Sequence, residues 1–416
     1  MLKVMVPVKN LCKGMFVSEL DRPWLDSPFI FQGFRITNTE ELQQLIETCE
    51  YVYVDKEKSI VSLPSKVMTW AEEKKSKNSN HIRLVNSALP YQASFEDELP
   101  LAWDAYEDTL ASISEILNDA RVGKNINSSP VKTAVNHLTD SIMRNPDALM
   151  LLSSLKGKGD FALGHAINTC VLSLIFGRFM GMDEAKLNEL GIGALLHDIG
   201  ETMVPTEILL KEGDRSPAED KIMRSHVDEG VKILENAAHI PDSAVDIARN
   251  HHERADGSGY PYKLINQQIG FLTKIVSIVD IYDTVTTGLY GRPPITCSLA
   301  LKNMYTWRKE MFDSSLIEKF IQCLGIYPIG SVVEFRSGEV GIVISVEPKM
   351  RLTPRVLLIL DENKNSLSPP KLINLALFQR GINQDRYKIS RVIESDRYDI
   401  DTRSYVIKDL NISLAS

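Results

Sequence analysis

The sequence predicts an α+β protein in which a helical core lies between a small N-terminal α+β module and a small C-terminal β appendage. Apolar residues recur at helical spacing through most of residues 147–325. Runs of β-branched and aromatic residues occur instead near both ends, as in Tyr51–Val54 and Val340–Ile344. At 416 residues, the chain is long enough for two or three domains.

Composition excludes several classes of protein. Hydrophobic residues make up 44% of the chain and charged residues 25%, as in ordinary globular proteins. A net charge of −8 argues against a nucleic-acid partner, although it leaves room for a small anionic ligand. The 5 cysteines form no Cys-x-x-Cys pair, which indicates reduced thiols. No signal peptide and no membrane-spanning stretch is visible, so we expect a soluble, cytoplasmic protein.

Residues 1–64 are predicted to form an N-terminal regulatory module of strands and one helix. The helix begins at Asn38, because Glu41 three residues later completes a capping box, and it ends near Cys49. The run Tyr51–Val54 is expected to form a strand. No combination of residues in this module indicates catalysis, so we expect it to regulate activity or to pack against other parts.

Residues 65–100 are predicted to be a polar linker, and residues 101–145 to form connecting helices. The linker is rich in charged and polar residues. In the first connecting helix, apolar residues from Trp103 to Ala120 recur every three or four positions. The second follows Ser129-Pro130 and closes at Asn145-Pro146. A helix in this place could carry the contacts of a homodimer, and signalling protein partners are also open.

Residues 146–328 form the predicted domain that holds the functional residues. Six of the 8 histidines lie within residues 165–252, and five of these six, all except His239, are candidate ligands that aspartates accompany. The helices are expected to place these side chains as follows: His165 in Ala162–Phe179, His197 near the end of Leu187–Ile199 with Asp198 beside it, His226 in a helix that starts at Ser216-Pro217, His251 and His252 at the end of Ala244–His252, and Asp280 in Thr273–Val285.

Residues 329–416 are predicted to be a β-rich C-terminal appendage. Val332–Phe335 and Val340–Ile344 flank a turn at Ser337-Gly338, which is the pattern of a hairpin. Val356–Leu360 is expected to add another strand.

The histidines and aspartates together predict a metal centre. A single buried histidine is more often a hydrogen-bonded core residue than a ligand. Asp280 is different, because a carboxylate between Val279 and Ile281 is costly to bury unless it is paired or bound to a cation. Adjacent His251 and His252 point about 100° apart on a helix, so both can face one site only where the helix ends. Imidazole and carboxylate ligands suit Fe, Mn and similar ions.

Two motifs carry a resemblance to a known family. Leu195-Leu196-His197-Asp198-Ile199-Gly200 resembles the HD superfamily of metal phosphohydrolases. Residues 251–261, His-His-Glu-Arg-Ala-Asp-Gly-Ser-Gly-Tyr-Pro, resemble the HD-GYP family of cyclic di-GMP phosphodiesterases. Gly14-Met15-Phe16-Val17 is similar to the uncharacterised module that often precedes this domain. The resemblance implies an HD-type helical bundle.

The resemblance also implies a dinuclear mechanism. Asp198 would bridge the two metals, and His197 and Asp198 would be the catalytic pair. A hydroxide shared by two divalent transition-metal ions would hydrolyse cyclic di-GMP to linear pGpG, and further cleavage to GMP is left open. The metals expected first are Fe or Mn, and Ni and other ions are left open. The ligands carried over are His165, His197, Asp198 and Asp280 for one metal, and Asp198, His226, His251 and His252 for the other.

The substrate contacts that the resemblance implies are Arg254, Asp256, Gly257, Gly259, Tyr260, Pro261 and Arg292. The chain departs from the family pattern at three positions. Glu201 replaces a lysine that contacts phosphate, and Leu289 replaces an arginine. Phe161 stands where some members have the glutamate of a third metal, so two metals are expected. These changes leave two alternatives open: a weakly active or inactive sensor or adaptor, and a hydrolase of another cyclic dinucleotide such as cyclic GMP-AMP.

Overall fold

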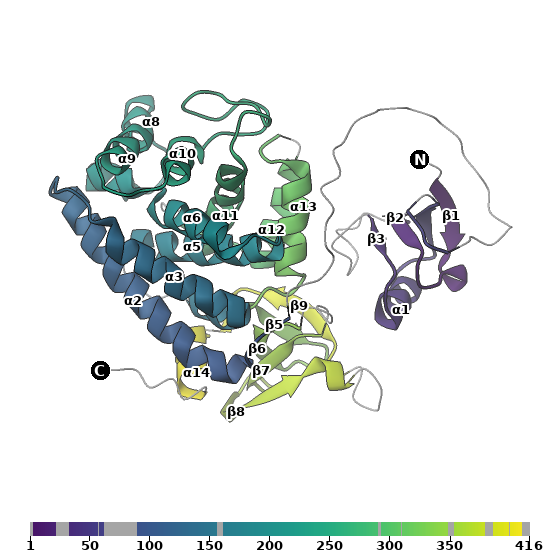
Figure 1. Ribbon diagram of the computed structural model, residues 1–416. Helices are drawn as coiled ribbons and strands as arrows, with labels where there is room; N and C mark the ends of the chain where they lie inside the picture. Colours follow the sequence, from purple (N-terminus) through teal and green to yellow (C-terminus); the bar gives the residue numbers. More distant parts are fainter. Residues whose placement is uncertain are drawn as a thin grey trace. The chain divides into compact units, whose positions relative to one another are not determined.

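The computed structural model describes residues 3–21, 33–56, 58–61, 90–155, 161–289, 293–308, 310–347, 353–378, 386–398 and 400–409. The chain divides into two compact units, Met1–Asn86 and Ser87–Ser416, which are described separately (Figure 1).

The first unit is a four-stranded antiparallel sheet with one helix. The strand order is β1-β4-β2-β3. The predicted capping box is confirmed, because the Asn38 side chain accepts a hydrogen bond from the Glu41 amide at 2.8 Å and Glu41 accepts one from the Asn38 amide. The elements are β1 (Lys3–Pro7), η1 (Val8–Asn10), β2 (Phe16–Leu20), β3 (Phe34–Arg35), α1 (Thr39–Thr48) and β4 (Tyr51–Asp55).

The first helix of the second unit begins earlier than the sequence analysis expected. Helix α2 spans Phe95–Arg121, so residues 95–100, assigned above to the linker, are helical. Ser94 explains the early start, since its hydroxyl accepts a hydrogen bond from the Asp97 amide and three acidic residues occupy the first turn.

The apolar stripe of α2 is also rotated from the one expected. The residues that face the core are Ala102, Ala105, Thr109, Ile113, Ile116 and Ala120, and Trp103 and Tyr106 flank them half-buried. This face packs against α3 (Ser128–Arg144) and α4 (Pro146–Ser154) of the same chain, because small side chains let the helices approach closely.

The helical core surrounds α5 (Phe161–Phe179), which packs against α6 (Glu184–Leu196) and α11 (Phe271–Thr287) near the centre of the unit (Figure 1). By length and composition α5 could cross a membrane, but 78% of its Ala162–Phe179 window is buried inside the protein, as in a core helix. The remaining helical elements are η3 (Ile199–Met203), α7 (Thr206–Leu209), α8 (Pro217–Arg224), α9 (His226–Glu235), α10 (Asp242–Asn250), α12 (Cys297–Trp307) and α13 (Ser314–Leu324).

The C-terminal part forms a five-stranded antiparallel sheet beside the helices, with strand order β8-β7-β6-β5-β9 (Figure 1). The three predicted strands are confirmed. Asp147 at the start of α4 accepts a hydrogen bond from the Val346 amide at 2.9 Å and thereby ties this sheet to the core. The elements are β5 (Val332–Phe335), β6 (Val340–Ser345), β7 (Arg355–Leu360), β8 (Ser366–Asn374), η4 (Leu375–Phe378), β9 (Ile389–Ile393), η5 (Ser395–Tyr398) and α14 (Thr402–Asp409).

Candidate metal centre

His165 lies in the first turns of α5 and meets two aspartates of α11. Its Nδ1 lies 2.7 Å from Asp283 Oδ2, and its Nε2 lies 3.2 Å from Asp280 Oδ1. Asn168, one turn along α5, donates a hydrogen bond to the other oxygen of Asp283 at 3.1 Å. The ring of His165 is therefore held by Asp283 on one side and presents its other nitrogen to Asp280.

His197 and Asp198 lie where α6 ends and the tighter turn η3 begins. The His197 Nδ1 donates to the Ala194 carbonyl at 2.8 Å, which turns Nε2 toward Asp198 Oδ2 at 3.1 Å. Gly200 in η3 has no room for a side chain, because a Cβ there would lie 1.9 Å from the His226 carbonyl oxygen. A glycine at this position therefore lets η3 lie directly on the backbone that carries His226.

The sequence predicted that His226 lies inside the helix that starts at Ser216, and this prediction is wrong. The capping box of Ser216 begins α8, but α8 ends at Arg224 and His226 is the first residue of α9. The Ser225 hydroxyl donates to the Ile222 carbonyl and the His226 Nδ1 donates to the Met223 carbonyl at 2.7 Å. These side chains satisfy carbonyls of the last turn, so α8 can end there.

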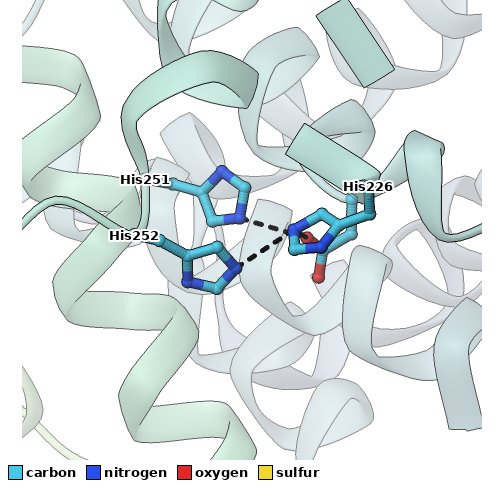
Figure 2. A group of neighbouring side chains, drawn as sticks. His226, His251 and His252 are labelled. Atoms are coloured by element: carbon cyan, nitrogen blue, oxygen red, sulfur yellow. Dashed lines mark hydrogen bonds and ion pairs between the residues drawn. The ribbon is translucent and has the colours of Figure 1, made fainter. Parts of the chain in front are cut away.

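His251 and His252 face the cluster together because α10 ends at Asn250, just before them. The prediction that a helix ends at this pair is confirmed, but the helix stops two residues before the predicted His252. The His251 Nδ1 donates to carbonyls of the preceding turn at 3.1 Å, and its Nε2 lies 3.1 Å from Asp198 Oδ1. The His252 Nε2 lies 3.1 Å from the Nε2 of His226. Figure 2 shows the rings of His251 and His252 turned toward His226.

All seven predicted ligands come together in two adjoining groups. In each group one ligand atom per residue lies within 4.8 Å of the others. Asp198 faces both groups, since Oδ1 lies 3.1 Å from His251 and Oδ2 lies 3.8 Å from the Nε2 of His165. The groups are Asp198, His226, His251 and His252, and His165, His197 and Asp280.

The inward atoms of this cluster lack ordinary partners. Among the described residues, Nε2 of His165, His197 and His251 and Oδ1 of Asp198 are buried without a hydrogen bond. Buried polar atoms are normally hydrogen-bonded, so a set of unpaired ones aimed at a common point fits a bound cation. Nitrogen and oxygen donors in this mixture suit divalent transition-metal ions.

Burial sets the protonation state of several ligands. It lowers the pKa of His226, and burial together with His251 holds the pKa of His252 well below its usual range, so both rings are neutral at pH 7. Burial acts to raise the pKa of Asp198, but the neighbouring imidazoles of His197 and His251 hold it well below its usual range. Neutral His226 and His252 and an ionised Asp198 are in the forms that bind metals. Burial acts to lower the pKa of His165, but Asp280 and Asp283 raise it well above its usual value, so that ring must lose its proton when a metal binds.

A glycine-rich loop, residues 253–264, closes one side of the cluster and contains most of the predicted substrate contacts. The Tyr260 ring stacks on His252 with centroids 4.7 Å apart. Gly259 admits no side chain, since a Cβ there would lie 2.5 Å from the Glu253 Cα. The Asp256 carboxylate accepts a hydrogen bond from the Ser258 amide at 2.8 Å, so it shapes the loop itself.

The remaining predicted substrate-binding residues differ in backbone conformation and in exposure. Gly257 has a φ of +79°, which favours glycine. Arg254 and Pro261 are exposed on the loop, and Tyr260-Pro261 is a cis peptide bond. Arg292 lies outside the described residues. Glu201 and Leu289, the two departures from the family pattern, are both buried.

Two functional candidates were missed or left open by the sequence. Glu253 is buried, and its carboxylate accepts hydrogen bonds from the amides of Tyr262 at 2.6 Å and Leu264 at 2.9 Å, so it braces the loop from inside. Its place in the motif beside His252 was the available signal. Asp283 had been weighed equally as a support and as a packing residue, and its contact with His165 favours support.

Comparisons with known proteins agree with this geometry. The HD domain family matches residues 151–316, and a domain of unknown function, DUF3391, matches residues 3–131. The latter match reaches beyond the predicted module and includes α2. The comparisons thus place the histidine cluster within an HD domain.

Curated relatives match the same region. Cyclic di-GMP phosphodiesterase PA4108 of Pseudomonas aeruginosa is 30% identical over 372 residues, covering 89% of this chain and 88% of that protein. A cyclic di-GMP phosphodiesterase of Thermotoga maritima is 33% identical over 34% of this chain and 39% of its own length. The 3'3'-cGAMP-specific phosphodiesterase 2 of Vibrio cholerae is 30% identical over 34% of this chain and 27% of its own length. The chain therefore belongs to the HD-domain family of cyclic di-GMP phosphodiesterases, as its two histidine motifs predicted, and carries a DUF3391 module before the HD domain.

Proposed function

We propose that this protein is a metal-dependent phosphodiesterase that hydrolyses cyclic di-GMP to linear pGpG at a dinuclear centre. The observation that carries the proposal is the position of Asp198, whose two oxygens face the two groups of candidate ligands. A carboxylate placed in this way can share its two oxygens between a pair of adjacent divalent ions. The curated names of relatives, PA4108 above all, supply the substrate.

His165, His197, Asp198 and Asp280 would hold one ion, and Asp198, His226, His251 and His252 the other. When bound, a pair of divalent ions supplies a water of lowered pKa and neutralises charge on the phosphodiester. Iron or manganese is the first expectation, because the donors are nitrogen and oxygen and no cysteine belongs to either group.

The chain's own residues orient and enclose the reacting phosphodiester. Asp283 fixes the ring of His165, so that its Nε2 points into the cluster. Tyr260 covers His252 and keeps water from that side of the cluster. Burial raises the pKa of Tyr260 above its usual value of 10, so its hydroxyl stays protonated and can donate a hydrogen bond to a phosphate or ribose oxygen. The Gly257 amide donates to the Arg254 carbonyl at 2.9 Å, so of these two glycines Gly259 offers the candidate backbone donor to the ligand.

The test is a product assay on protein loaded with Mn²⁺ or Fe²⁺. Cyclic di-GMP is incubated with wild type and with Asp198→Ala, metal content is measured in both, and nucleotides are separated. We expect pGpG from wild type and none from Asp198→Ala, whose metal content should fall. Cleavage by Asp198→Ala at the wild-type rate would contradict the mechanism. If GMP forms after pGpG in the wild-type reaction, the enzyme also cleaves the linear dinucleotide.

A second candidate is cleavage of another cyclic dinucleotide. The relative named as specific for 3'3'-cGAMP favours including that substrate, as do the uncharged Leu289 and the acidic Glu201. The same assay with 3'3'-cGAMP separates the two, because the ratio of kcat/KM values identifies the preferred substrate. Binding of either dinucleotide by metal-loaded protein without turnover would support the sensor alternative instead.

A further inference from the structure

Arg224, the last residue of α8, lies one aromatic ring away from the metal cluster. Its guanidinium carbon is 4.6 Å from the centroid of the Tyr260 ring, and the same ring stacks on His252 at 4.7 Å. Arg224 is also two residues before His226 in sequence. Two separate connections, one through the ring and one along the chain, therefore fix this arginine beside the cluster.

The guanidinium of Arg224 is available to a ligand. Its side chain is 51% exposed, and its ion pair is with Asp220 one turn earlier, at 2.7 Å through Nε. An exposed pair of this kind contributes little to folding. The planar guanidinium has five N–H donors, so an ion pair at Nε leaves donors for a phosphate.

A cyclic dinucleotide needs such a group. It carries two phosphodiesters, and when one lies at the metals the other remains as an anion in the open part of the site. Neither Glu201 nor Leu289 supplies positive charge to that region. Arg224 does, because Tyr260 holds it beside the cluster.

We propose that Arg224 binds the second, non-reacting phosphodiester of the cyclic dinucleotide and so determines the preference for that substrate class. The proposal rests on the proposed function. Tyr260 positions the guanidinium, and Asp220 competes with the substrate for it. Arg224 thus acts on substrate binding, while the bond that breaks is at the metal cluster.

The ion pair between Arg224 and Asp220 allows a test by two substitutions whose expected effects on substrate binding are different. If Arg224 binds phosphate, Arg224→Gln weakens substrate binding, whereas Asp220→Asn removes a competitor and leaves binding equal or tighter. If the pair serves only to hold α8 in place, both substitutions have the same effect. Arg249→Gln is a matched control, because Arg249 also precedes a cluster histidine by two residues and pairs with a carboxylate, Glu235, at 2.6 Å.

The experiment measures kcat and KM of the metal-loaded variants on two substrates. Cyclic di-GMP has two phosphodiesters, and bis(p-nitrophenyl) phosphate has one. We expect Arg224→Gln to raise KM for cyclic di-GMP about 10- to 100-fold, the loss typical of a charge-assisted hydrogen bond, with an unchanged KM for the single phosphodiester. Arg224→Lys should recover part of the loss, since lysine keeps the charge and lacks the planar fork.

The outcomes separate this proposal from the proposed function. An unchanged KM for cyclic di-GMP in Arg224→Gln would overturn the Arg224 assignment alone. Equal losses on both substrates, or a fall in metal content, would overturn it in favour of a structural role. Wild-type protein that cleaves bis(p-nitrophenyl) phosphate and does not cleave cyclic di-GMP would overturn the proposed function, and the assignment with it.

Discussion

The Asp283 carboxylate lies 2.7 Å from the Nδ1 of His165, across two helices that are far apart in the sequence. This contact fixes the orientation of the ring, so that Nε2 faces Asp280 and the cluster. A carboxylate behind a ligating histidine also increases the basicity of the imidazole. Asp283 therefore belongs to the candidate metal centre, although it is not placed to be a ligand itself.

Substituting Asp283 by Asn should weaken metal binding about 10- to 100-fold without unfolding the protein. The amide keeps the shape of the side chain but removes the charge that holds His165. Metal content after dialysis against a graded chelator series gives the affinity, and circular dichroism checks the fold. Asp313→Asn is the control, because Asp313 is hydrogen-bonded to Ser315 and Asn266 away from the cluster histidines. Equal metal affinity in wild type and Asp283→Asn would contradict the assignment.

Substituting Gly200 by Ala should destabilise the protein by at least about 2 kcal/mol, because overpacking forces backbone shifts. The added methyl would lie 1.9 Å from the His226 carbonyl oxygen and 2.5 Å from the Gly230 amide nitrogen. Urea unfolding measures the effect. Gly164→Ala is the matched control, since a Cβ there has no atom within 4 Å and the residue lies in helix α5, where alanine is favoured. A neutral Gly200→Ala would mean that η3 and α9 can separate at little cost.

Removing Arg144 should cost about 3–5 kcal/mol of stability, since it leaves the Glu98 carboxylate buried and unpaired. The Glu98 side chain is 0% exposed and accepts two hydrogen bonds from Arg144, at 2.6 and 2.9 Å, that join α2 to α3. Urea unfolding of Arg144→Ala tests this. Lys232→Ala, which breaks an exposed pair with Glu229, should change stability by less than about 0.5 kcal/mol. Similar small effects of both substitutions would contradict the prediction.

Most of the candidate site could be predicted from the sequence, because its ligands come in local motifs. His197 and Asp198 are adjacent, and so are His251 and His252, and the end of a helix makes each pair face one point. The Asp283 contact was harder to foresee, since no local pattern indicates which side chain lies behind His165. The break between α8 and α9 was missed as well, because it depends on hydrogen bonds from the Ser225 and His226 side chains.

The fold was predictable where helix caps and β-branched runs beside a turn were strong, as at Asn38 and in β5 to β7. Strand β8 was not predicted, since Pro369 and Pro370 within it argue against a strand. The structure explains their presence, because β8 is an edge strand and its prolines need no partner on the open side. Likewise, an internal proline made residues 95–100 resemble a linker, although Ser94 caps the helix there.

Substituting Glu253 by Ala should loosen the 253–264 loop while both groups of candidate ligands remain intact. The buried carboxylate accepts the amides of Tyr262 and Leu264, and no other described residue is hydrogen-bonded to those two amides. We expect full metal content, KM for cyclic di-GMP raised about tenfold, and faster hydrogen exchange at residues 260–264. Glu253→Gln, which keeps one acceptor oxygen, should fall between wild type and Glu253→Ala.

The combination of readouts identifies what Glu253 does. If Glu253 only shapes the loop, Glu253→Ala keeps the wild-type metal content and the wild-type rate on bis(p-nitrophenyl) phosphate, while its KM for cyclic di-GMP rises. The reason is that cleavage of the single phosphodiester depends on the metals and not on the loop. A parallel loss of metal would instead make Glu253 a support of His252, its neighbour in sequence. Unchanged exchange rates at residues 260–264 in Glu253→Ala would show that the backbone hydrogen bonds of the loop, such as those from Ala255 to Met311 and from Tyr260 to His252, hold it without Glu253.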